Sequence, residues 1–435
     1  MPSAISTGKE RITKFTNCRL VKGDELVEQD LWVSSATGKI VRSQEVFYGK
    51  HAVPDATINL GGRIIAPGLI DVQLNGAFGF NFSSIPEDPS SYGKTLKQVN
   101  KLLVQTGVTS YLPTLTSNLQ EVYHQALPHL GPSGALRLSE DGAESLGAHC
   151  EGPFLSPSKN GIHPAEVLVP ATNGFSDLEA MYGACNINPT LDPLSGHVLA
   201  PKIKKITAAP EIAAMTATIP EITSRGIVYS IGHTEASYEE ASAAVAAGAT
   251  MITHLFNAMR PLHHRNPGVF GVLGIAESLP RPYFGIIADG IHLHPTSIKI
   301  AFNAHPEGFI LVTDAMHLVG LEDGVYEWGN GERIVKVGSK LLLEGTEKIA
   351  GSSITLIECV SNFLNFSGAT IPQALKAVTA TPAAMLGLTG VKGSLESDAD
   401  ADLVVLEEEV DESGKRNLRI DQVWKFGSKM FDRSE

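Results

Sequence analysis

Cysteine and basic charge are both scarce in this sequence. Its 435 residues include four scattered cysteines, Cys18, Cys150, Cys185 and Cys359, and no CxxC pair. So few cysteines in a chain of this size do not form a disulfide framework, and we expect free thiols in a reducing compartment. Lys and Arg number 34 against 47 Asp and Glu, which gives a net charge of −13. That balance leaves no basic surplus to neutralise phosphates, so it argues against a nucleic-acid partner.

Long apolar runs are missing as well. No stretch approaches the roughly 20 consecutive apolar residues that a membrane-spanning helix needs. The first 15 residues are polar and contain no apolar core, so they do not resemble a secretion signal. We therefore expect a cytoplasmic protein without a membrane partner. Apolar residues still make up 43% of the chain, enough for a sizeable core.

The central part of the chain alternates short apolar, β-rich segments with amphipathic helical segments. Such a pattern is typical of a parallel sheet that is buried on both faces. Eight units predict an α/β fold, a (β/α)8 barrel of the TIM type rather than an open, doubly wound sheet. The expected strands are Leu69–Leu74, Val108–Thr114, Ser145–Glu151, Ile203–Ala208, Ile227–Gly232, Thr250–His254, Phe284–Asp289 and Phe309–Asp314. Helices are expected at Ser91–Gln105, Glu211–Arg225, Ser237–Ala247 and His294–Asn303, among others.

The two ends of the chain contain short β-like segments separated by turn residues. Neither end can bury a core alone, so we expect them to join as one small β-sandwich domain. The predicted division is residues 1–66 and 390–435 for this domain and 67–389 for the barrel. Two segments rich in Gly, Pro and polar residues, 131–143 and 183–200, are interpreted as insertions.

Four residues suited to hydrolytic chemistry lie at the C-terminal ends of predicted strands. Glu151 ends the third strand, His233 the fifth, His254 the sixth and Asp314 the eighth. In a barrel these ends meet at one mouth, where active sites are built. Three of them can hold a metal ion with an open position for water, while a carboxylate moves protons. One such residue alone is more often a cap than a ligand, but four at one mouth favour a metal-dependent hydrolase.

The first predicted strand carries Gln73 and Asn75 in the context DVQLNG. This segment resembles the amidohydrolase superfamily, in which two histidines often occupy the corresponding positions. Side-chain amides are much weaker ligands for a transition metal than imidazole. The fourth strand also has no lysine at its end to form a bridging carbamate. The sequence therefore predicts one metal ion rather than a binuclear centre.

A longer series of motifs resembles the N-acetylglucosamine-6-phosphate deacetylase family. The segments run in order from Ala66 to Leu388: APGLIDVQLNGAFG, AHCEGPFLSPSKNGIHP, APE, IGHTEAS, THLFNAM, RNPGVFG, IADGIHLH, LVTDAM, AGSSITL and TPAAMLGL. No single segment is specific, but the ordered set is. The resemblance implies hydrolysis of the acetamide of N-acetylglucosamine 6-phosphate by a metal-activated water, with glucosamine 6-phosphate and acetate as products.

The resemblance also implies roles for individual residues. Glu151, His233 and His254 would bind one divalent metal ion, zinc in the first place and iron, cobalt or manganese as alternatives. Asp314 would act as general base and then general acid, and His163 would help to polarise the acetamide carbonyl. Substrate contacts would come from Ile162, His163, Asn257, Ala258, Arg265, Asp289, Gly290, Ile291, His292, Ile349, Ala350 and Gly351. The resemblance further implies a homodimer in which Arg265 reaches into the neighbouring active site.

Two other functions remain as alternatives. Another mononuclear amidohydrolase could act on a cyclic amide or an N-acyl amino acid, and an intact phosphate-binding set argues against it. A non-catalytic amidohydrolase-like scaffold should have lost metal ligands or the catalytic Asp, whereas Glu151, His233, His254 and Asp314 are all present.

Overall fold

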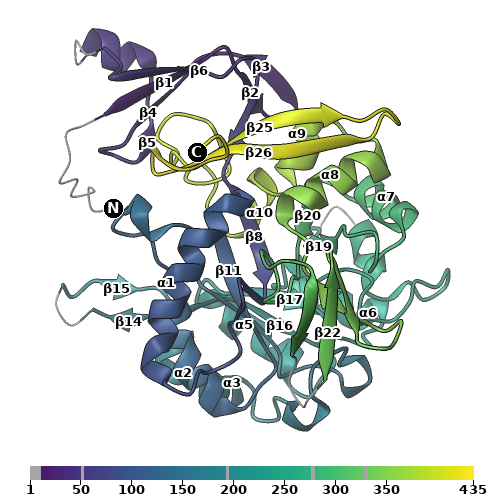
Figure 1. Cartoon of the computed structure of the whole chain (residues 1–435). Coiled ribbons are helices and arrows are strands. Elements are labelled where there is room, and N and C mark those ends of the chain that lie inside the picture. Colours follow the sequence, from purple (N-terminus) through teal and green to yellow (C-terminus); the bar gives the residue numbers. More distant parts are fainter. Residues whose placement is uncertain (1–10, 50–52, 193–194, 276–279, 328–331) are drawn as a thin grey trace.

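The centre of the molecule is a nearly closed barrel of eight parallel strands (Figure 1). The structure, a computed structural model, describes residues 11–49, 53–192, 195–275, 280–327 and 332–435. The strands follow the order β8 (Leu69–Leu74), β11 (Val108–Thr116), β13 (Ala148–Glu151), β16 (Ile203–Ala208), β17 (Val228–Ile231), β18 (Met251–Ile252), β19 (Tyr283–Ile287) and β20 (Phe309–Val312). An isolated parallel bridge between Leu74 and Ala315 joins the last strand to the first. The predicted barrel is therefore confirmed.

Helices pack around the outside of the barrel, so most barrel strands are buried along their whole length. The longer helices are α1 (Tyr92–Leu103), α2 (Gln120–Leu130), α3 (Phe175–Tyr182), α5 (Met215–Ser224), α6 (Tyr238–Ala247), α7 (Pro295–Ala304) and α8 (Leu356–Ser367). Shorter ones are α4 (Ala184–Ile187), α9 (Ile371–Lys376) and α10 (Ala380–Met385). Helix α6 begins at a capping box of Ser237 and Glu240 and ends before Gly248, whose φ is +117°. Among the described residues, none of the helices is long and apolar enough to cross a membrane.

Some predicted strands differ from the observed ones. The run Ser145–Glu151 is broken into β12 (Glu144–Ser145) and β13, because Gly147 lies between them with a φ of +117°. The segment 183–200, interpreted as an insertion, contains a small hairpin of β14 (Thr190–Leu191) and β15 (Val198–Leu199). Residues 193 and 194 of that segment lie outside the described residues. A four-stranded sheet follows β20, made of β21 (Gly324–Glu327), β22 (Arg333–Val337), β23 (Lys340–Leu343) and β24 (Ile349–Ser352).

The chain ends form two further sheets at one end of the molecule, one from N-terminal strands alone and one from strands of both ends (purple and yellow in Figure 1). One sheet has the order β5 (Lys39–Ile40), β4 (Leu31–Ser34), β1 (Ile12–Thr16) and β6 (Ala56–Asn59). The other has the order β27 (Ser428–Asp432), β26 (Arg416–Lys425), β25 (Leu403–Val410), β7 (Ile64–Pro67), β2 (Arg19–Lys22) and β3 (Glu25–Glu28). A separate apolar cluster packs between the sheets, with the rings of Phe15 and Trp424 4.9 Å apart. The chain ends therefore share one core, as predicted.

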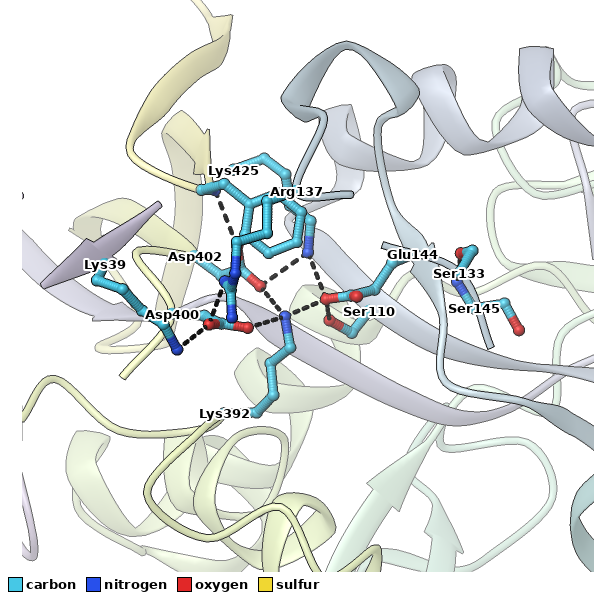
Figure 2. A network of polar contacts seen from close by, with 11 residues as sticks. Lys39, Ser110, Ser133, Arg137, Glu144, Ser145, Lys392, Asp400, Asp402 and Lys425 are labelled. Atoms are coloured by element: carbon cyan, nitrogen blue, oxygen red, sulfur yellow. Dashed lines mark hydrogen bonds and ion pairs between the residues drawn. The ribbon is translucent and has the colours of Figure 1, made fainter. Parts of the chain in front are cut away.

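A buried ion-pair network connects the barrel to these sheets (Figure 2). The Lys392 ammonium lies 2.6 Å from Asp402 and 2.8 Å from Asp400, and it also contacts Glu144. The Lys425 ammonium lies 2.8 Å from Asp402 and 2.7 Å from Glu144. These three carboxylates are close enough to hold a metal ion. However, the lysines already compensate their charge, so we assign the cluster a structural role.

We expect Lys392→Met to lower the free energy of unfolding by about 3–5 kcal/mol, because the loss of one partner leaves buried carboxylates without compensation. Burial raises the pKa of Asp402, but Lys392 and Lys425 outweigh this effect and hold that pKa below its ordinary value. The stabilisation is therefore present above pH about 4 and is lost as the pH falls further. Denaturant unfolding at several pH values measures both effects. Lys429→Met, which removes the partly exposed ion pair with Asp432, is the control and should cost at most about 1 kcal/mol; equal losses would contradict the prediction.

Candidate active site

Glu151, His233 and His254 converge at the C-terminal mouth of the barrel. Glu151 Oε1 lies 3.3 Å from His233 Nε2 and 3.0 Å from His254 Nε2, and the two Nε2 atoms are 3.0 Å apart. Each residue is at most 4% exposed. Ligand atoms about 2.0–2.1 Å from a tetrahedral metal ion lie about 3.3 Å from one another. The three atoms therefore fit one metal ion, and the residues that carry them line the cavity described below.

Neighbouring groups orient these three side chains. His233 Nδ1 donates to the Lys159 carbonyl at 2.8 Å, so Nε2 keeps a free lone pair, as a metal ligand requires. Gln73 Nε2 donates to Glu151 Oε1 at 3.0 Å. Gln73 thus supports the carboxylate ligand. The Lys159 contact joins residues 74 positions apart, so no local sequence pattern predicts it.

The backbone at the mouth is strained. His233, His254 and Asp314 have φ values of +49°, +29° and +45°. Non-glycine residues in such conformations cost about 1–3 kcal/mol each and persist where surrounding contacts hold them. All three residues lie two positions beyond the ends of barrel strands, and the strained turns direct their side chains into the mouth.

Asp314 is partly buried and accepts a hydrogen bond from the residue that follows β8. Asn75 Nδ2 donates to Asp314 Oδ1 at 2.9 Å, and the Asp314 amide donates to the Gln73 carbonyl at 2.9 Å. Burial, followed by the negative charge of Glu151, raises the pKa of Asp314. A raised pKa makes this carboxylate a better proton acceptor than an exposed aspartate.

His163 reaches the mouth from the loop after β13. Its Nδ1 accepts from the Ser117 amide at 3.0 Å and lies 2.8 Å from the Ser117 hydroxyl. Since an amide only donates, the proton of neutral His163 sits on Nε2. Burial, and then the charge of His233, lower the pKa of His163 to about 3. The imidazole is therefore neutral at pH 7 and presents an N–H donor. Ser117 was missed, because nothing in its local sequence connects it to His163.

A cavity of about 390 Å³ covers this cluster. Most residues predicted to act on the substrate or metal line it: Glu151, Ile162, His163, His233, His254, Asn257, Ala258, Ile291, His292, Asp314, Ile349 and Gly351. Four others do not. Asp289 is buried and Gly290 is exposed, Ala350 packs in a small apolar cluster with Met316, and Arg265 is exposed outside the cavity.

Asp289 favours the protonated form of His292, which lines the cavity. Its Nδ1 lies 2.6 Å from Asp289 Oδ2, and Asp289 Oδ1 also accepts from the Ile291 and His292 amides. Burial lowers the pKa of His292, but the hydrogen bond to Asp289 and the negative charge of that carboxylate outweigh it, so the pKa is raised. Among the described residues that line the cavity, there is no lysine or arginine. Asp289 therefore acts on the cavity through His292.

Comparison with known proteins places these features in a family. Residues 64–429 match the sequence profile of the Amidohydrolase family. The chain is 40% identical over 412 residues to N-acetylglucosamine-6-phosphate deacetylase of Danio rerio, covering 94% of this chain and 96% of the relative. It is also 40% identical to the Homo sapiens protein of that name, covering 92% of each. A solved structure of a Mycobacterium smegmatis N-acetyl-D-glucosamine-6-phosphate deacetylase variant in complex with N-acetyl-D-glucosamine-6-phosphate has a TM-score of 0.74 at 26% identity, covering 97% of this chain and 100% of that chain.

Proposed function

We propose that this chain, which belongs to the N-acetylglucosamine-6-phosphate deacetylases of the amidohydrolase family, hydrolyses N-acetylglucosamine 6-phosphate to glucosamine 6-phosphate and acetate. One observation carries the proposal: the side chains of Glu151, His233 and His254 converge beneath a cavity that also contains Asp314 and His163. The four unpaired cysteines support a cytoplasmic location.

The family implies a divalent metal ion, and Glu151, His233 and His254 would hold it. One carboxylate and two imidazoles are a ligand set that suits zinc, which we propose as the native ion. Iron, cobalt and manganese accept the same ligands. When bound, a divalent ion polarises the acetamide carbonyl and lowers the pKa of the neighbouring water to about 7.

Asp314 and His163 carry out the remaining steps. Asp314 accepts a proton from the water as the water attacks the carbonyl carbon, and Asn75 keeps its carboxylate in place. His163 donates its Nε2–H to the carbonyl oxygen as that oxygen becomes negative, a contribution of about 2.7–4 kcal/mol for one such donor. Asp314 then returns the proton to the nitrogen, the C–N bond breaks, and the amino sugar phosphate and acetate leave.

We assign phosphate binding to His292, to the Asn257–Ala258 segment and to Arg265. A dianionic group needs positive charge, and the raised pKa of His292 favours its protonated form, while the described cavity residues include no lysine or arginine. Arg265 is exposed, and its guanidinium has no ion pair or hydrogen bond within the described part of the chain. We therefore propose a homodimer in which Arg265 enters the partner subunit's cavity and forms a charge-assisted pair with the phosphate.

We expect Arg265→Ala to raise the KM for N-acetylglucosamine 6-phosphate about 10- to 150-fold, the effect of losing a hydrogen bond to a charged group. The rate with unphosphorylated N-acetylglucosamine should change little. Steady-state acetate release with both sugars measures the difference, and Arg433→Ala, which removes an exposed arginine near the C-terminus, is the control. Equal losses with both sugars would show that Arg265 supports the fold instead.

Mixing two impaired variants tests whether Arg265 acts in the partner subunit's active site. A heterodimer of Arg265→Ala and Asp314→Asn chains would contain one site with both defects and one with neither. Activity should therefore partly recover once subunits have exchanged. Absence of recovery, with exchange confirmed, would place Arg265 in its own subunit's site.

Acetate release from N-acetylglucosamine 6-phosphate, together with metal analysis of the purified protein, tests the proposed function as a whole. We expect one divalent ion per chain and a strong preference for the phosphorylated sugar. Hydrolysis of cyclic amides or N-acyl amino acids in its place would favour another amidohydrolase activity. A metal-loaded protein that hydrolyses none of these compounds would favour a scaffold.

A further inference from the structure

We propose that Asp71 and Thr313 are positioning residues that hold Asp314 in its catalytic orientation, an inference that rests on the proposed function. Asp71 lies on β8, and Thr313 directly precedes Asp314 just beyond the end of β20. Their exposed fractions are only 1% and 2%. Neither residue lines the cavity, so any effect on the reaction must pass through another residue.

The Asp71 carboxylate binds Thr313 with both oxygens. The Thr313 hydroxyl donates to Oδ2 at 2.6 Å, and the Thr313 amide donates to Oδ1 at 3.4 Å. The Gln73 amide also donates to Oδ1, at 3.2 Å. One carboxylate thus connects the ends of β8 and β20 where the barrel closes, next to the proposed base.

The Thr313 hydroxyl also binds the residue that follows Asp314 in the chain. Its oxygen accepts from the Ala315 amide at 3.3 Å while its proton goes to Asp71. The hydroxyl group of the residue before Asp314 is therefore hydrogen-bonded to the residue after it. Asp314 itself has a φ of +45°, a conformation that a non-glycine residue keeps only when its surroundings impose it. The Asp71–Thr313 contact is the part of those surroundings that acts on both flanks of the strained residue.

Barrel closure alone does not explain a carboxylate at this place. The interior of such barrels is mostly filled by Val, Ile and Leu, and a buried carboxylate is costly unless it is well bonded. Within the described residues Asp71 forms no ion pair, since the nearby Lys205 ammonium donates to the Val72 carbonyl at 2.8 Å. Burial, opposed by the hydrogen bonds from Thr313 and Gln73, raises the pKa of Asp71 to about 7. A valine would close the barrel at lower cost, but it could not bind the two N–H groups and the hydroxyl that set the turn at Asp314.

Thr313→Val and Thr313→Ser form a matched pair that tests the inference. Valine keeps the shape and removes the hydroxyl, whereas serine keeps the hydroxyl. We expect Thr313→Val to lower kcat about 10- to 100-fold, as a base displaced by about 1 Å would. KM should stay within about threefold, and one metal ion per chain should remain, because substrate and metal contacts are untouched. Thr313→Ser should restore kcat to within about threefold of wild type.

Two further variants separate positioning from stability. Asp71→Asn should lower kcat as Thr313→Val does, and it carries the test if Thr313→Val does not fold. Thr218→Val removes an equally buried hydroxyl, which donates to the Ala214 carbonyl on the outer helix layer, and should leave kcat unchanged.

Three results would overturn the positioning role while acetate release by the wild type upholds the proposed function. They are wild-type kcat in both Thr313→Val and Asp71→Asn, loss of metal in proportion to loss of activity, and failure of serine to restore kcat. A wild-type protein that releases no acetate from N-acetylglucosamine 6-phosphate would instead overturn the proposed function, and this inference with it.

Discussion

Asp314→Asn is expected to lower kcat by about 10²–10⁴-fold or more while the fold and the bound metal ion remain. Asparagine has nearly the same shape, but its amide cannot accept the proton of the attacking water. The same group is also needed to return that proton to the leaving nitrogen, so both half-reactions are affected. Acetate release at saturating substrate, metal analysis and thermal unfolding together measure the effect.

The pH dependence of kcat/KM is a second test of Asp314 as the general base. Only the deprotonated carboxylate accepts a proton, so kcat/KM of the wild type should fall as the pH falls. The apparent pKa of this limb belongs to the pair formed by Asp314 and the attacking water, because the two groups are coupled. Asp411→Asn, a change in a surface turn, is the control and should leave kcat unaltered. A wild-type kcat in Asp314→Asn would mean that the base lies elsewhere.

His254→Asn is expected to lose the metal ion and the activity together. His254 Nε2 is one of the three candidate ligand atoms, with those of Glu151 and His233, and an amide is a poor substitute for imidazole. Loss of a group that merely supports a ligand typically lowers metal affinity about 10- to 100-fold, and loss of a ligand should cost more. Metal content after dialysis, compared with acetate release before and after metal is added back, measures both quantities.

Gln73→Ala is the matched control, because Gln73 donates to Glu151 in this structure. It should keep one metal ion per chain at a protein concentration well above the dissociation constant. Stoichiometric metal in His254→Asn would refute the ligand assignment, and loss of metal in Gln73→Ala alone would make Gln73 a ligand.

Parts of the fold with clear local patterns could be predicted. Strand β16 has the predicted bounds Ile203–Ala208, since its apolar run lies between Pro201 and Pro210. Helix α6 begins where a capping box predicts a start. The prediction for β18 was too long, because the chain leaves the strand after Ile252 and His254 takes a positive φ for which the sequence contains no local pattern.

What the sequence by itself determined is which side chains reach the barrel mouth. The alternation of apolar runs sets the strands, and Glu151, His233, His254 and Asp314 stand at or just beyond their C-terminal ends. These are short-range patterns, so they can be recognised without knowing how distant segments meet.

Only the tertiary structure decided how those side chains are held. Thr313 binds Asp71 across 242 positions, Ser117 binds His163 across 46, and Lys425 binds Glu144 across 281. Each contact depends on the register in which the barrel closes or packs against the terminal sheets. Hydrogen bonds require partners within about 3 Å, and no pattern along the chain encodes that proximity.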